Sequence, residues 1–124
     1  MQQPATVLVV DDELGPRESL RMTLHPPYRV LLATAGEQAL CLVEQEPVDV
    51  VLLDLRLPGL SGLQVLEQLK ARNPALAVIV VSGADPFGLV PAERRELIFE
   101  YIAKPFQVAH VRETVKRAVA HRAQ

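Results

Sequence analysis

Short apolar runs alternate along the chain with longer segments of helical patterning. The runs are rich in Val, Ile and Leu and predict strands at residues 6–10, 29–33, 48–53, 77–81 and 100–103. The segments between them predict helices at residues 16–24, 36–45 and 61–72, and a C-terminal helix through Val108, Val111, Val115 and Val119. Residues 50–53 and 77–81 show no alternation of apolar and polar side chains, which is typical of parallel strands covered on both faces. We therefore expect an α/β fold: a doubly wound five-stranded parallel sheet in the flavodoxin-like order 2-1-3-4-5, with helices on both faces.

The segment of residues 84–99 breaks the helical pattern. Pro86 and Pro91 lack backbone donors and disfavour helix at the residue before each, and Gly88 lies between them. We expect an irregular loop to about Val90, then a short helix that Pro91 opens in its first turn. Its end is expected to pack onto the sheet through Leu97, Ile98 and Phe99.

Length and composition narrow the functional classes. The 124 residues suit one domain spanning 1–124, and 49% hydrophobic with 23% charged residues excludes wholesale disorder. A net charge of −2 gives no footprint for nucleic acid or an anionic membrane surface. No apolar run is long enough to span a membrane, no secretory signal opens the chain, and Cys41 is expected to be a small buried residue. These features predict a cytoplasmic domain.

Polar residues gather where the predicted strands end. Asp11 and Asp12 follow the first strand and Asp54 follows the third, and these strands are neighbours in the expected order. Carboxylates this close repel one another unless a cation intervenes, and an all-oxygen, partly open site suits Mg²⁺. Ser82 ends the fourth strand and Lys104 follows the fifth. Together they form a plausible phosphoryl-transfer site, in which an Asp carries the phosphoryl group while Mg²⁺ and Lys neutralise its oxygens.

Each of these residues also has an ordinary structural explanation. Asp11 or Asp12 alone could cap the following helix, and Asp54 stands shortly before a Pro-Gly turn. Ser82 precedes a glycine in a loop, and a lone Lys104 is commonly solvated. Their joint occurrence at the ends of alternate strands favours the functional interpretation.

Four stretches carry a resemblance to a known family. They are residues 7–13 (VLVVDDE), 54–62 (DLRLPGLSG), 80–83 (VVSG) and 101–106 (YIAKPF). With them, the sequence resembles the receiver domain of two-component response regulators over essentially its whole length. The resemblance implies that Asp54 accepts a phosphoryl group from a phosphohistidine on a sensor kinase. It also implies that Asp11, Asp12, Asp54 and the backbone carbonyl of Arg56 hold Mg²⁺.

The resemblance assigns roles to three further residues. Ser82 and Lys104 would each bind a phosphoryl oxygen, and Tyr101 would be an aromatic switch that changes rotamer. A cis Lys104–Pro105 peptide is implied as well, which would aim Lys104 into the site.

The same resemblance implies the partners. These are a sensor histidine kinase or phosphotransfer protein, a downstream effector domain or protein, and a second copy of the chain in a homodimer. No direct binding to nucleic acid or membrane is expected, and self-catalysed phosphorylation and hydrolysis without a separate substrate would not make the domain an enzyme. Two departures bear on the output surface. Leu97–Ile98 replaces a small Gly-Ala pair, and His110 stands where one transcription-factor subfamily has Glu in its dimer face.

Three alternatives remain open at this stage. A degenerate receiver would act only as a protein-interaction module. An Asp-nucleophile phosphatase of the haloacid-dehalogenase type would have a second Asp where this chain has Arg56. A flavin- or nucleotide-binding module would need a phosphate-cradling loop after the first strand, where residues 11–13 are all acidic.

Overall fold

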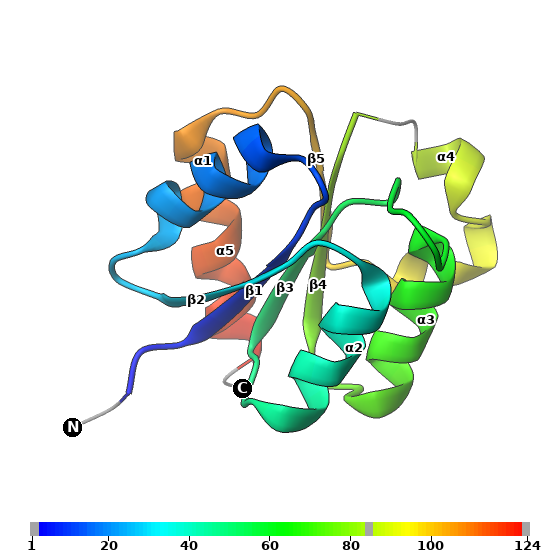
Figure 1. The fold of residues 1–124 in the computed structure, drawn as a ribbon, viewed down its shortest axis with the longest axis horizontal. Helices are drawn as coiled ribbons and strands as arrows, with labels where there is room; N and C mark the ends of the chain where they lie inside the picture. Colours follow the sequence, from blue (N-terminus) through cyan, green and yellow to red (C-terminus); the bar gives the residue numbers. More distant parts are fainter. Residues whose placement is uncertain (1–2, 84–85, 123–124) are drawn as a thin grey trace.

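The computed structural model describes residues 3–83 and 86–122. Its elements are β1 (Thr6–Val10), α1 (Leu14–Leu24), β2 (Arg29–Ala33), α2 (Gly36–Gln45), β3 (Val50–Leu53), α3 (Gly62–Arg72), β4 (Ala77–Ser82), α4 (Pro86–Leu89), the 3₁₀ helix η1 (Ala92–Leu97), β5 (Glu100–Ala103) and α5 (Val108–Arg122) (Figure 1). All neighbouring strands pair in parallel, in the order β2-β1-β3-β4-β5. The predicted fold class and strand order are confirmed.

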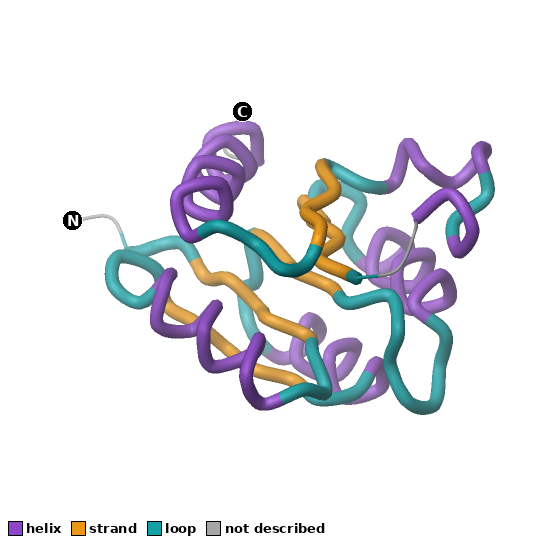
Figure 2. The backbone as a smooth tube through the Cα atoms, turned by 90° about the horizontal axis from the view of Figure 1, so that it is seen from above, coloured by secondary structure: helices purple, strands orange, loops and turns teal. Residues whose placement is uncertain are grey.

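Helices cover both faces of the sheet, α1 and α5 on one and α2 and α3 on the other (Figures 1 and 2). Side chains of β1 point alternately to the two faces. Val7 and Val9 pack with α1 and α5, whereas Leu8 and Val10 pack with α2 and α3. Since all four are at most 1% exposed, neither face of the strand has room for a polar residue. Within the described residues, no helix is both long and apolar enough to cross a bilayer.

Two predicted boundaries shift by two residues. β3 begins at Val50 rather than at residue 48, because Asp49 bonds Thr6 through both its main chain and its side chain. The Asp49 carboxylate accepts a hydrogen bond from the Thr6 N–H at 2.8 Å. α1 begins at Leu14 rather than at residue 16, and Pro16 is tolerated in its first turn, where no helical hydrogen bond needs its N–H.

The loop between β3 and α3 is fixed at the start of the helix. The Ser61 hydroxyl accepts a hydrogen bond from the Gln64 N–H at 3.2 Å, and the Gln64 side chain accepts one from the Ser61 N–H at 3.0 Å. Gly62 approaches the preceding loop so closely that a Cβ there would lie 2.5 Å from Leu55 Cα. This capping box and close approach hold the loop that follows β3 against α3.

The segment before β5 differs in part from the prediction. The expected irregular loop to Val90 is wrong at Pro86–Leu89, which form the single turn α4; Ala84 and Asp85 lie outside the described residues. Pro86 takes the first helical position, where its missing N–H costs nothing. The helix expected after Pro91 is present as η1, with Pro91 as its N-cap rather than inside its first turn. Its end packs onto the sheet as predicted, through Leu97, Ile98 and Phe99.

Cys41 is exposed, so the expectation that it is buried is wrong. The buried stripe of α2 runs through Gly36, Ala39 and Leu40, at the i, i+3 and i+4 positions of a helical face. Cys41 lies about 100° further around the helix from Leu40, which turns it toward solvent.

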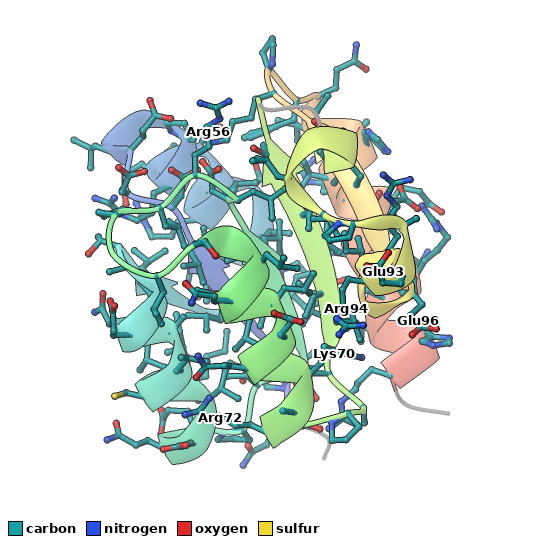
Figure 3. All side chains as sticks on the ribbon, turned by 90° about the vertical axis from the view of Figure 1, so that its right-hand side faces the viewer. Arg56, Lys70, Arg72, Glu93, Arg94 and Glu96 are labelled. Carbon is teal, nitrogen blue, oxygen red and sulfur yellow. The ribbon has the colours of Figure 1, made fainter. Side chains whose placement is uncertain are left out.

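Charged side chains tie the outer elements together. Arg94 of η1 pairs with Glu67 of α3 at 2.8 Å, and Figure 3 shows Arg94 beside α3. On the other side of β5, the Glu100 carboxylate accepts hydrogen bonds from three residues of α5. These are Arg117 at 2.7 Å, Thr114 at 3.0 Å and His110 at 3.3 Å. Burial alone would raise the pKa of Glu100, but these bonds outweigh it and hold that pKa below its usual value.

Candidate functional site

Three carboxylates meet at the carboxyl ends of β1 and β3, the upper edge of the sheet in Figure 1. The pairing of Val10 with Leu53 sets Asp11 and Asp54 side by side, and the Asp54 N–H donates to the Val10 carbonyl at 3.0 Å. Asp11 and Asp54 are buried, at 2% and 5% exposed, whereas Asp12 is exposed. One carboxylate oxygen from each of the three acids lies within 4.8 Å of the others. The acids that the sequence singled out therefore form one cluster.

Lys104 lies between the two buried acids. Its Nζ is 2.6 Å from Asp11 Oδ2 and 2.7 Å from Asp54 Oδ2, with Glu13 Oε1 further away at 3.7 Å. Its N–H donates to the carbonyl of Ser82 at 3.1 Å, and the Lys104–Pro105 peptide is cis, as the resemblance implied. Burial alone would lower the pKa of Lys104, but the two aspartates outweigh it and raise that pKa above its usual value. The residue is thus a charged ammonium at neutral pH.

Three donors from three loops hold the Asp54 carboxylate. Its Oδ1 accepts hydrogen bonds from the Arg56 N–H at 2.9 Å and from the Ser82 hydroxyl at 3.3 Å, and Oδ2 accepts one from Lys104. Arg56 lies at this edge of the sheet, whereas Lys70 and Arg72 lie toward the opposite end of α3 (Figure 3). The carboxylate is therefore oriented before any ligand arrives.

Tyr101 is connected to the site through the main chain of Ser82. Ser82 is fully buried at the end of β4, and the Tyr101 hydroxyl donates to its carbonyl at 3.0 Å. The Tyr101 ring is half-buried against the cluster of side chains that packs with α2 and α3. A shift at Ser82 therefore has a direct route to the ring.

A cleft of about 640 Å³ reaches Asp54 and Lys104 from outside. Gly15, Pro16 and Ser19 of α1 line one part of it, and Pro105 and Phe106 line another. A small phosphorylated group, or a side chain presented by a partner, can therefore reach the Asp54 carboxylate.

The donor set fits a hard divalent cation. Asp11, Asp12 and Asp54 offer only carboxylate oxygens, and the exposure of Asp12 leaves one side of the cluster open to water. The structure adds two neighbours to which the sequence gave no role. Glu13 lies near Lys104, and Arg17 donates to the Asp11 carbonyl at 3.0 Å. Glu13 extends the run of acids, a signal visible in the sequence, but nothing in the spacing of Arg17 marks its bond.

The chain matches one family over most of its length. The family model for the response regulator receiver domain matches residues 7–116. The hydrogenase transcriptional regulatory protein HoxA of Cupriavidus necator is 40% identical over 116 residues, which are 93% of this chain and 24% of that protein. Sporulation initiation phosphotransferase F of Bacillus subtilis is 30% identical over 112 residues, 90% of each chain.

A solved structure agrees with these matches. The signal receiver domain of an HD domain-containing protein from Pseudomonas fluorescens Pf-5 superposes with a TM-score of 0.91 at 25% identity, covering 99% of this chain and 92% of that one. The chain spans about a quarter of the length of HoxA, so it matches one part of that protein. The buried aspartate cluster fits the phosphorylation site of such domains. The chain belongs to the family of response regulator receiver domains, which are signalling modules.

Proposed function

We propose that this receiver domain accepts a phosphoryl group on Asp54 from a phosphohistidine of a sensor histidine kinase or phosphotransfer protein. The observation that supports this most directly is the Asp54 carboxylate, buried, held by three donors and reached by an open cleft. An Asp54 oxygen would attack phosphorus while the N–P bond breaks, and the imidazole leaves with the bonding electrons. The product is an acyl phosphate on Asp54.

The neighbouring residues would stabilise the transferred group. Lys104, which now pairs with Asp54 and Asp11, would pair with one phosphoryl oxygen, and the Ser82 hydroxyl would bind another. Asp11, Asp12, Asp54 and the backbone carbonyl of Arg56 would hold Mg²⁺, which when bound neutralises charge on the phosphoryl group. Water reaching the cleft would later hydrolyse the acyl phosphate, so the domain would reset itself.

Signalling would follow from the link between Ser82 and Tyr101. When Ser82 moves toward the phosphoryl group, its carbonyl moves with it, and the hydroxyl of Tyr101 bonds that carbonyl. The ring would then change rotamer and alter the surface around β5 for an effector or a second copy of the chain. A cytoplasmic location is part of this proposal, because a sensor kinase draws its phosphoryl group from ATP.

Two alternative functions have less support. A degenerate receiver would not need the acids, Ser82 and Lys104 to meet, yet they do. A phosphatase would need a second acid near the nucleophile, where this chain places the side chain of Arg56.

Intact-mass spectrometry with acetyl phosphate and Mg²⁺ tests the proposal. We expect one added phosphoryl group in the wild type and in Asp49→Asn, and none in Asp54→Asn. Asp49 is a matched control because it stands at the opposite end of β3 and bonds Thr6. Labelling of Asp54→Asn at the wild-type level would refute the proposed acceptor.

A further inference from the structure

Arg17 reaches back from α1 to the turn that carries the first two acids. Its Nη1 donates a hydrogen bond to the main-chain carbonyl of Asp11 at 3.0 Å, and its own N–H donates to the Glu13 carbonyl at 3.2 Å. The side chain is half-buried. Arg21, in the same helix, instead directs its guanidinium to Glu18 at 2.8 Å on the surface. The two arginines therefore differ in what they hold.

The bond from Arg17 completes the fixation of Asp11. The Asp11 N–H donates to the Ala33 carbonyl at 3.0 Å, Oδ1 accepts from the Glu13 N–H at 2.9 Å, and Oδ2 accepts from Lys104 at 2.6 Å. Its carbonyl is the remaining polar group, and Arg17 is its donor. That carbonyl belongs to the planar peptide that joins Asp11 to Asp12. A bond that holds this plane sets the direction of both acids.

We propose that Arg17 is a positioning residue for the divalent-cation site, acting through the Asp11–Asp12 peptide. The inference rests on the proposed function, since it takes Asp11, Asp12 and Asp54 as the Mg²⁺ ligands. A group that orients a ligand without touching the metal commonly sets its affinity. The competing account treats Arg17 only as a positive charge near the acids. A bare charge would repel Mg²⁺, so its removal would tighten binding, whereas removal of a positioning group weakens binding.

Mg²⁺ titration of four proteins separates the two accounts: wild type, Arg17→Met, Arg17→Lys and Arg21→Met as the matched control. We expect about tenfold weaker Mg²⁺ binding in Arg17→Met. Arg17→Lys should lie between it and the wild type, because it keeps the charge but loses the planar fork. Arg21→Met should bind like the wild type.

A second measurement needs no metal. In metal-free protein, the Glu13 amide, which bonds Asp11 Oδ1, should exchange its hydrogen faster in Arg17→Met and at the wild-type rate in Arg21→Met.

Mg²⁺ binding by Arg17→Met that equals or exceeds the wild-type affinity would overturn the inference and leave the proposed function intact. Absence of Mg²⁺ binding in the wild type would overturn both. Should Arg17→Met fail to fold, wild-type affinity in Arg17→Lys would overturn the inference.

Discussion

Replacing Lys104 by Met removes the cation that lies between two buried carboxylates. Its Nζ is 2.6 Å from Asp11 and 2.7 Å from Asp54, and Asp12 brings a third carboxylate within 4.8 Å. Two unit charges at that separation repel by about 3 kcal/mol at an effective dielectric constant of ~20. The exposure of Asp12 and the open cleft let water screen part of this repulsion. We expect Lys104→Met to lower the free energy of unfolding by about 2–4 kcal/mol at neutral pH without divalent cation.

Added Mg²⁺ should restore most of that loss, because a cation held by the three acids replaces the missing ammonium. Urea denaturation of wild type and Lys104→Met, with and without Mg²⁺, measures both effects. Lys70→Met is the matched control. Lys70 donates to the carbonyls of Pro74 and Leu76 at 2.9 and 2.7 Å, so its loss should not respond to Mg²⁺. The reasoning is refuted if Lys104→Met is as stable as the wild type without Mg²⁺, or gains no more from Mg²⁺ than the wild type does.

Three further substitutions test other parts of the structure. Gly62→Ala would place a Cβ 2.5 Å from loop backbone and should destabilise the fold by about 3 kcal/mol in urea denaturation, whereas Gly15→Ala meets nothing within 4 Å and should not destabilise it. Ionised Glu100 stabilises the fold because its pKa is lowered on folding; this contribution is complete above the usual value of 4.5 and is lost as pH falls through the folded value. The stability advantage of the wild type over Glu100→Gln, about 1 kcal/mol, should therefore shrink below pH 4.5, and a constant difference would contradict this. Ser82→Ala should still accept a phosphoryl group but show smaller phosphorylation-induced NMR shifts around Tyr101; shifts identical to those of the wild type would argue against the coupling.

The fold could be predicted from local pattern because each strand is buried on both faces. Val7 to Val10 leave no doubt about a covered strand, since neither face has a polar residue to turn toward water. Cys41 shows the limit of such reasoning. It adjoins the apolar residues of α2 in sequence, but its exposure depends on an angle of about 100° around the helix. α4 was missed because Pro86 and Gly88 weigh against helix in general, whereas Pro86 falls at the one position that tolerates it.

The acids of the site could be predicted because strand order alone makes β1 and β3 neighbours. Asp11 and Asp54 then meet whatever the surrounding side chains are. The bonds among the site's residues could not be predicted in this way. That Lys104 bridges both buried acids, and that Arg17 holds a carbonyl six residues before it, depends on how long side chains bend back within the folded chain. Sequence spacing carries no information on those paths.

The position of the phosphoryl group in the wild-type protein tests the account most directly. After incubation with acetyl phosphate and Mg²⁺, borohydride reduction of the acyl phosphate followed by peptide mass spectrometry identifies the residue that carried it. The account predicts that the reduced residue is Asp54 and that its labelling disappears when Mg²⁺ is chelated. A phosphoryl group mapped to any other residue, or labelling of Asp54 that persists without divalent cation, would contradict it.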